Sequence, residues 1–204
     1  MANVRPVGDD GQQAESLMAW KTRDVLVAAA IAVPLGLVYA GWLALWVAAQ
    51  IVPELSHFMG GLYVLAPVIV GYIVRRPGAA LLAEMVAALV ETPFTPYGTI
   101  ILWLGFLQGI GVEAVFALTG YRRYSLPILM LAGVVGALAV LFGRSYLAFG
   151  YGSLAIDVQI LRFVATVVGG ALLGGLLGKL IADALIPTGV LNNFPIARSR
   201  VREV

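Results

Sequence analysis

The sequence contains no cysteine and a single histidine, His57. Without cysteine, the chain has no thiolate metal site, no redox-active dithiol and no disulfide framework. One histidine cannot by itself form a histidine-based metal site. The sequence also lacks a P-loop and the H-E-x-x-H and G-x-S-x-G motifs. We therefore expect that the chain is not an enzyme, hydrolyses no ATP itself and holds no cofactor or metal.

Charged residues are also scarce. They make up 12% of the chain, whereas hydrophobic residues make up 61%. A soluble domain is usually about half apolar and about a quarter charged, so both values indicate a multi-pass membrane protein. The formal net charge is only +2, and no basic patch is interleaved with aromatic residues, so we expect no nucleic-acid partner.

Six long apolar runs fill most of the sequence. A helix needs roughly 20 residues to cross the hydrocarbon core of a bilayer. The third run is shorter than that and lies between Pro77 and Pro93, which predicts a short helix sheltered by its neighbours or a partial span. The expected fold class is an all-α integral membrane bundle of six transmembrane helices. The six runs cover about residues 25–52, 58–74, 78–92, 97–119, 126–149 and 158–181.

Lys and Arg in the short loops orient the bundle, because cytoplasmic loops are enriched in these residues. They occur at alternate ends of the runs, whereas the loops "PELSH" and "PFTP" have none, so we expect both termini in the cytoplasm. The polar N-terminus lacks the apolar core of a secretory signal and is expected to remain as a flexible tail. The expected organisation is a cytoplasmic tail at 1–20, the transmembrane domain at 21–186 and a second cytoplasmic tail at 187–204. The orienting residues are Lys21, Arg23, Arg75, Arg76, Arg122, Arg123, Arg198, Arg200 and Arg202.

Two carboxylates interrupt the short third run. Glu84 and Glu91 are seven residues apart, close to two turns of helix, so they lie on one face. An ionisable side chain within a span is costly and usually faces the bundle interior or a wet cavity. Tryptophans and an amide are expected at similar depth on other runs, which predicts a pocket for a small, planar, polar or cationic ligand in the outer half of the membrane. The candidate binding residues are Glu84, Glu91, Gln108, Trp103, Trp42 and Trp46.

Several of these candidates also have a structural interpretation. Trp46 fits an interfacial aromatic belt, and Glu91 fits a helix end that meets headgroup water. Gln108 fits an amide that only ties two helices together by hydrogen bonds. Two further candidates are equally open. Glu113 is either a site residue or a buried structural acid, and Tyr151 lies in an aromatic loop that either closes over the pocket or lies at the interface.

Two other groups of residues suggest structural contacts. A set of charged residues near the third outer loop fits an ion-pair group at the outer surface. In the first run, small residues recur at every fourth position, which suits close helix contact within the chain or with a partner. The charged set is Arg144, Asp157 and Arg162, and the ridge of small residues includes Ala28, Ala32 and Gly36.

Two long motifs resemble the YkoE family. They are "RRPGAALLAEMVAALVE" at 75–91 and "GFLQGIGVEAVFALTGYRRY" at 105–124. The stretches "MAWKTRDVLVAAAIAVPLGLVY" at 18–39 and "TGVL" at 188–191 also fit, so the resemblance covers nearly all of the chain after residue 18. Members of this family are substrate-binding S components of bacterial energy-coupling factor (ECF) transporters.

The resemblance implies an S-component bundle in the bacterial plasma membrane that captures a vitamin outside and delivers it inward. It implies three kinds of partner: thiamin or its hydroxymethylpyrimidine precursor as ligand, a transmembrane coupling subunit, and ATP-binding-cassette ATPases. S components of this class often present an Ala-x-x-x-Ala contact to the coupling subunit, which Ala28 and Ala32 match, with Gly36 one step further. The competing hypothesis is a stand-alone, proton-coupled secondary transporter of a small cationic solute, with Glu84 and Glu91 as the proton relay.

Overall fold

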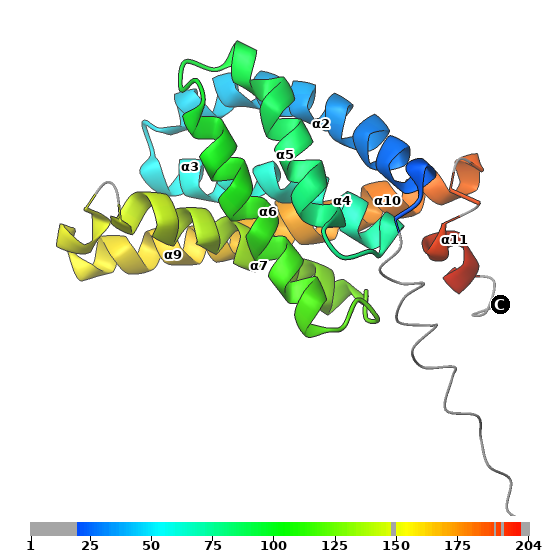
Figure 1. Ribbon diagram of the computed structural model, residues 1–204. Coiled ribbons are helices and arrows are strands. Elements are labelled where there is room, and N and C mark those ends of the chain that lie inside the picture. The colour runs from blue at the N-terminus through cyan, green and yellow to red at the C-terminus, as the bar shows by residue number, and fades with distance from the viewer. Residues whose placement is uncertain (1–19, 148–149, 190, 193, 201–204) are drawn as a thin grey trace, which may run out of the picture.

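Helices form the regular structure of this chain (Figure 1). The computed structural model describes residues 20–147, 150–189, 191–192 and 194–200, and every regular element within those residues is helical. Five of the helical segments are long and apolar enough to cross a membrane. The all-α class is therefore confirmed, whereas the count of six spans and the cytoplasmic placement of both termini stay predictions.

The five long segments are partly composite, because several of them change helix type along their length. The second segment begins at Pro53, earlier than predicted, with the proline in the first turn, where its missing N–H costs nothing. The segments are α2 (Thr22–Ala49); α3 (Pro53–Met59), η1 (Gly60–Val64) and α4 (Leu65–Val74); α6 (Ile100–Leu118); α7 (Leu126–Val140) with the π-helical η3 (Leu141–Tyr146); and α9 (Ile156–Gly169), the π-helical η5 (Gly170–Leu176), α10 (Leu177–Leu185) and η6 (Ile186–Thr188). The shorter helices are η2 (Thr92–Phe94), η4 (Tyr151–Ser153) and α11 (Pro195–Arg200).

The short third run forms α5 (Ala79–Glu91), which has 13 residues. It packs against α2, α4 and α6, so neighbouring helices shelter it on several sides. Ala80, Ala83 and Ala87 are fully buried on its inner face, and such small side chains let the backbones approach closely. The structure thus favours a sheltered helix over an isolated partial span.

The core is centred on α4, because all ten of its residues are buried. α11 packs against α4, and the side chains of Leu191, Phe194 and Ile196 are buried there. Part of the segment predicted as a C-terminal tail therefore packs against the bundle.

Glycines allow the closest backbone contacts of the bundle. A Cβ atom added to Gly169 would lie 2.0 Å from the carbonyl oxygen of Phe58, and one added to Gly61 would lie 2.1 Å from the backbone of Gly169. A Cβ on Gly133 would likewise lie 2.2 Å from the carbonyl oxygen of Gly170. These contacts hold the second, fourth and fifth long segments together at distances that only glycine permits.

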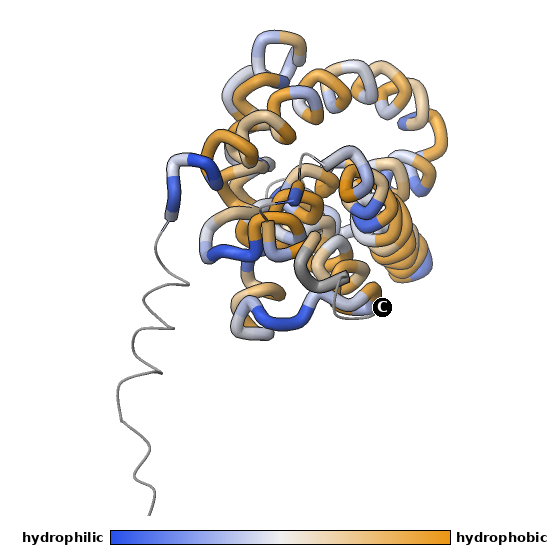
Figure 2. Tube along the Cα trace, turned by 90° about the vertical axis from the view of Figure 1, so that its right-hand side faces the viewer, coloured by the Kyte–Doolittle hydropathy of each residue, from blue (hydrophilic) through white to orange (hydrophobic). Residues whose placement is uncertain are grey.

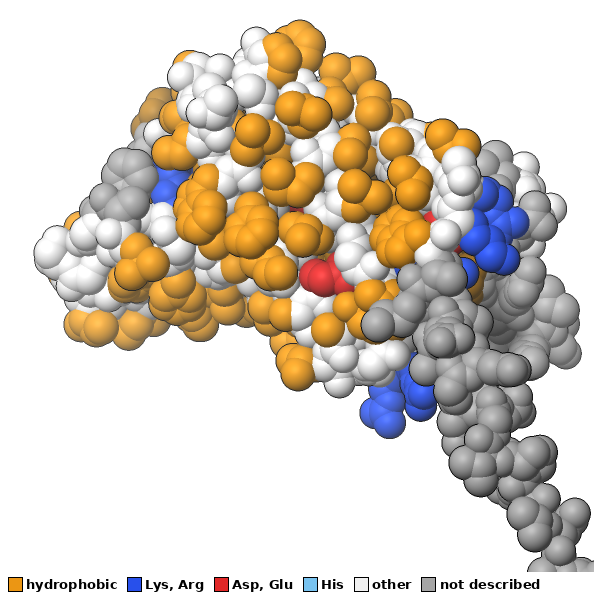
Figure 3. Space-filling model, in the orientation of Figure 1, with side chains coloured by type: hydrophobic (Ala, Val, Ile, Leu, Met, Phe, Trp, Pro, Cys, Tyr) orange, Lys and Arg blue, Asp and Glu red, His pale blue; other side chains and the backbone are white. Residues whose placement is uncertain are grey.

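Polarity is concentrated at the ends of the bundle. Figure 2 shows apolar residues along the helices and many of the hydrophilic ones at their ends and turns. In Figure 3 hydrophobic side chains cover the middle of the visible face, and most Lys and Arg side chains gather toward one end. We call this end, which carries Lys21, Arg23, Arg75, Arg76, Arg122 and Arg123, the positive end. At this end the buried carboxylate of Asp24 pairs with Arg76 at 2.8 Å, which ties the start of α2 to the loop before α5.

Candidate ligand-binding site

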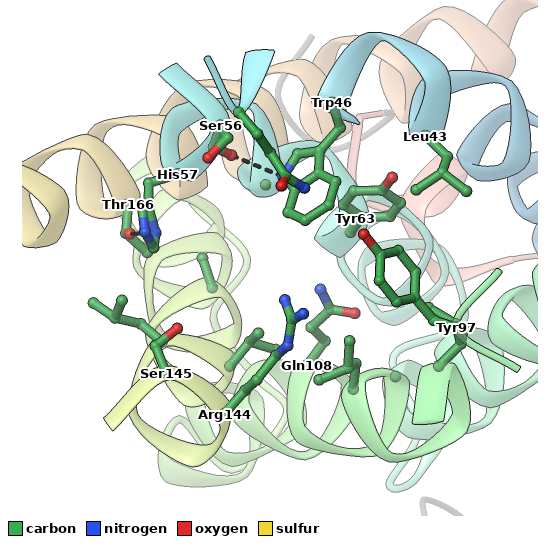
Figure 4. Close-up of a pocket in the computed structure, with 18 of the residues that line it drawn as sticks. Leu43, Trp46, Ser56, His57, Tyr63, Tyr97, Gln108, Arg144, Ser145 and Thr166 are labelled. Carbon is green, nitrogen blue, oxygen red and sulfur yellow. Dashed lines mark hydrogen bonds between the residues drawn. The ribbon is translucent and has the colours of Figure 1, made fainter. Parts of the chain in front are cut away.

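A cavity of about 350 Å³ opens between the helices in the half of the bundle away from the positive end. Its walls come from α2, α3, η1, α5, α6, the α7–η3 segment, η4 and α9. In Figure 4, His57, Thr166 and Ser145 lie on one side of the cavity, and Tyr63 and Tyr97 lie on the other. The volume lies at the lower end of the roughly 300–1,000 Å³ that is usual for small-molecule sites.

Glu84 and Glu91 both line this cavity from α5, on one face of the helix. The Glu84 side chain is almost completely buried, with 1% exposed. Its Oε2 accepts a hydrogen bond from the Tyr39 hydroxyl at 3.3 Å, and that hydroxyl accepts another from the backbone N–H of Ala66 at 2.9 Å. The carboxylate is therefore held in position by groups from α2 and α4. The cavity needs such fixed polar groups if it is to orient a ligand.

Aromatic and amide groups complete this side of the cavity. Trp46 donates its indole N–H to the carbonyl of Ser56 at 3.0 Å, which fixes the ring against α3. The ring of Tyr97 meets Trp46 edge to face, with centroids 6.3 Å apart. Gln108 lines the same space from α6, and in Figure 4 its side chain points into the cavity. The predicted candidates Trp46, Gln108 and Tyr151 thus all lie in the cavity wall.

Two of the predicted tryptophans do not line the cavity. Trp103 is 52% exposed on the outside of α6, where it stacks on Phe106 with ring centroids 5.7 Å apart. Trp42 faces inward but donates its indole N–H to the carbonyl of Met59 at 3.1 Å, which ties α2 to the end of α3. In this structure Trp103 is a surface residue of the apolar belt, and Trp42 is a packing residue beside the cavity.

Glu113 also lies outside the cavity and caps α5 instead. Its carboxylate accepts hydrogen bonds from the backbone N–H groups of Gly78, Ala80 and Leu81 at 2.6, 3.0 and 3.3 Å. The first N–H groups of a helix have no partner within the helix, and a carboxylate satisfies them and complements the helix dipole. The Tyr121 hydroxyl donates a further bond at 2.7 Å, and burial together with this bond raises the pKa of that hydroxyl. The structure therefore places Glu113 as a buried acid at the start of α5 and not in the cavity wall.

The ridge of small residues on α2 faces the inside of the bundle. Ala28 and Ala32 are fully buried, and a Cβ atom on Gly36 would lie 2.6 Å from the carbonyl oxygen of Ala87 in α5. In this conformation the ridge packs against α5, so these residues are not exposed to a partner subunit. The sequence left this alternative open, because the small-residue spacing identifies a close helix contact but not the identity of the other helix.

Arg144 and Arg162 are cavity residues that the sequence analysis placed at the outer surface. They line the cavity from η3 and α9 together with His57, Ser145 and Thr166. Asp157, the third member of the expected ion-pair group, is exposed and is not part of the wall. The sequence analysis missed Arg144, although its position inside an apolar run could have identified it, because a cation there is as costly as the carboxylates of Glu84 and Glu91. The described residues contain no group of three or more His, Cys, Asp or Glu side chains placed to hold a metal ion.

Comparison with known proteins identifies relatives over nearly the whole chain. A family model described as the permease component of an ABC-type cobalt transport system matches residues 23–139. YkoE of Bacillus subtilis (strain 168), named as a candidate HMP/thiamine permease protein, is 35% identical over 185 residues, which cover 89% of this chain and 92% of that protein. A crystal structure of an S-component of an ECF transporter superposes with a TM-score of 0.86 at 34% identity, covering 91% of this chain and 95% of the other.

The relatives, the fold and the polar cavity agree with one another. The structural neighbour shares the helical bundle over 95% of its length, and the identity with the Bacillus protein is 35%. Several helices of this chain are long and apolar enough to span a membrane, as a multi-pass transport protein of the bacterial plasma membrane requires. The chain belongs to the YkoE family of S components of energy-coupling factor transporters.

Proposed function

We propose that this S component captures thiamin or its hydroxymethylpyrimidine precursor in the cavity described above. The observation that carries the proposal is the pair of buried carboxylates, Glu84 and Glu91, in a cavity walled by aromatic rings. A buried acid is costly unless it meets a partner, and an aminopyrimidine offers an exocyclic amine as a hydrogen-bond donor. The name of the Bacillus relative supports the same ligand class.

The cavity offers each part of such a ligand a matching group. Glu84 and Glu91 can accept from the exocyclic amine or offset the positive charge of the thiazolium ring. Trp46 and Tyr97 supply flat faces on which either ring can stack or a cation can rest. The Gln108 amide can both donate and accept, so it can pair with a pyrimidine ring nitrogen or amine. The tie from Tyr39 to Glu84 keeps the carboxylate in place before the ligand arrives.

The cavity is proposed to open toward the outside of the cell. The positive end carries the Lys and Arg residues of the short loops, and such residues concentrate on the cytoplasmic side of membrane proteins. The cavity lies in the opposite half of the bundle, so a ligand would enter from outside. Release inward would then require a conformational change driven by partner ATPases, because this sequence has no P-loop.

The coupling subunit is proposed to contact the exposed face of α2. Since Ala28 and Ala32 are buried and Gly36 lies against α5, the contact must use other residues of the same helix. Ala30 and Ala44 are exposed on that face, and a Cβ atom on Gly41 would meet nothing within 4 Å. Small residues on a lipid-facing surface permit close approach of another helix.

The ligand assignment is tested by titrating the detergent-purified chain with thiamin and, separately, with hydroxymethylpyrimidine. Tryptophan fluorescence and calorimetry would follow binding to the wild type, to Glu84→Gln and to Glu54→Gln, whose side chain is not part of the cavity wall. We expect saturable binding that weakens roughly tenfold or more in Glu84→Gln, because a hydrogen bond to a charged group is lost, and that is unchanged in Glu54→Gln. Absence of binding by the folded wild type would refute the ligand assignment.

The alternative function is a stand-alone, proton-coupled transporter of a small cationic solute. The observation that favours it is the same pair of buried acids, because intramembrane carboxylates often form proton relays. The two functions differ in one requirement: the transporter would accumulate its solute without partner subunits, whereas the S component would only bind it.

A further inference from the structure

The cavity has a second polar side, which the vitamin assignment leaves without a role. Arg144 reaches it from η3 and Arg162 from α9, and each brings a guanidinium group, which has only donors and no acceptor. Glu84 and Glu91 lie on α5, in a different wall. The formal charges of these four cavity residues balance. A cavity that only had to accept a cation would not need two arginines in its wall.

The group around Arg162 is well defined. Its Cζ lies 4.7 Å from the centre of the Tyr151 ring, and that ring meets His57 edge to face at 5.8 Å. Nδ1 of His57 is 3.5 Å from the Thr166 hydroxyl. The Nε of Arg162 is buried and makes no hydrogen bond in the structure. Donors and a positive charge are therefore gathered in one part of the wall, and a buried N–H without an acceptor is unfavourable unless a ligand supplies one.

Arg144 lies between this group and the aromatic side. Its Cζ is 5.9 Å from the centre of the Tyr97 ring, and in Figure 4 its guanidinium points into the cavity. The residue sits in η3, a π-helical turn, and such turns often occur at functional sites because they redirect side chains. Ser145, the next residue, also lines the cavity and is buried.

We propose that Arg144 and Arg162 form an anion subsite that takes the phosphate of a monoester, so that the cavity binds phosphorylated aminopyrimidines in addition to the free vitamin. A planar guanidinium matches the oxygens of a phosphate with two parallel N–H donors, which makes arginine the preferred residue for this group. The Ser145 hydroxyl adds a donor on the same side, whereas the Thr166 hydroxyl already donates to the backbone carbonyl of Arg162 at 2.9 Å. This proposal rests on the proposed function, because the carboxylates would still hold the amine end of the ligand.

The test compares four probes by calorimetry: hydroxymethylpyrimidine, its phosphate monoester, thiamin and thiamin monophosphate. Each is titrated into the wild type, Arg162→Gln, Arg144→Gln and Arg123→Gln, a control arginine that is exposed at the positive end. We expect each monoester to bind the wild type roughly tenfold or more tightly than its alcohol, because charged hydrogen bonds form only with the ester. Both cavity variants should lose this preference while keeping the affinity for the alcohols, and Arg123→Gln should behave as the wild type.

The outcomes separate this proposal from the proposed function. If the alcohols bind but the monoesters bind no better, or if their advantage survives both arginine variants, the anion subsite is refuted and the vitamin assignment stands. If the variants lose alcohol and ester equally, the arginines have only a structural role and the subsite is again refuted. If the wild type binds none of the four, both proposals fail. Arg162→Lys keeps a cation but lacks the two parallel N–H donors of a guanidinium group. This variant should retain part of the preference for the monoesters even if Arg162→Gln does not fold.

Discussion

At the scale of single residues, the site depends on how Glu84 is held. Its carboxylate accepts from the Tyr39 hydroxyl, which itself accepts from the N–H of Ala66. Ala66 lies in the first turn of α4, just after η1 ends, where backbone N–H groups lack a complete set of partners within the helix. The hydroxyl thus satisfies a buried backbone donor and positions the acid at the same time.

Tyr39→Phe removes both roles of the hydroxyl, and the free energy of unfolding and the ligand affinity report on them separately. The variant leaves the N–H of Ala66 without its acceptor, so we expect a loss of roughly 1–3 kcal/mol in the free energy of unfolding. We also expect weaker ligand binding, because the carboxylate of Glu84 is no longer fixed. Tyr63→Phe is the matched control for stability, because the Tyr63 hydroxyl is buried without a hydrogen-bond partner. Equal unfolding transitions for the two variants would contradict this account of the network.

At the scale of helices, α5 carries both cavity acids and is held in place by the helices around it. Glu113 of α6 holds its first turn through three backbone N–H groups, and α2, α4 and α6 surround it. The carboxylate that caps the start of α5, Glu113 of α6, is therefore distinct from Glu84 and Glu91, the two carboxylates that face the cavity. Substitutions at these two kinds of acid should have different consequences.

Glu113→Gln tests the role of the cap. The amide replaces one acceptor oxygen with an NH₂ group that faces backbone donors, so we expect the free energy of unfolding to fall by roughly 2 kcal/mol or more. The affinity of the folded protein for hydroxymethylpyrimidine should stay within about twofold of the wild type, because Glu113 does not line the cavity. Unfolding in detergent and calorimetry measure the two quantities. A large loss of affinity with unchanged stability would place Glu113 in the site after all.

Gly169→Ala tests the close contact between α9 and the second segment. The added Cβ atom would lie 2.0 Å from the carbonyl oxygen of Phe58, so the helices must separate, and we expect a loss of roughly 1–3 kcal/mol. The wall residues His57 and Thr166 lie close to this contact along their helices, so ligand affinity should fall as well. Gly41→Ala is the control, because its Cβ would meet nothing and alanine favours a helix. Similar behaviour of the two variants would contradict the proposed contact.

At the scale of the whole molecule, the sequence predicted the depth of residues better than the direction in which they face. Glu84, Glu91 and Gln108 lie in the cavity wall, at the depth that helical rise gives them and with the inward direction expected of a buried charge. Trp42 and Trp103 lie outside the wall, because helices that are apolar all round carry little information about which face is buried. The direction in which a tryptophan points is then decided by packing. Ligand binding by all five residues stays a prediction.

Two further features depend on the assembled bundle. Arg144 lies in a π-helical turn, which changes the register of its helix relative to a regular α-helix and cannot be read from residue spacing. The spacing of Ala28 and Ala32 predicted a close helix contact, but only the fold identifies α5 as the other helix. The proposed contact of the coupling subunit uses the exposed face of α2, and the sequence analysis did not propose this face as a partner contact.

Reconstitution into liposomes is the most direct test of whether this chain is the binding subunit of a partner-driven importer. The measurement is uptake of radiolabelled thiamin by liposomes that hold the chain alone or the chain with a coupling subunit and its two ATPases, each with and without internal ATP and an imposed proton gradient. We expect binding but no accumulation by the chain alone, and accumulation only with the partners and ATP. Concentrative uptake by the chain alone that collapses with the proton gradient would contradict this expectation and establish the secondary transporter.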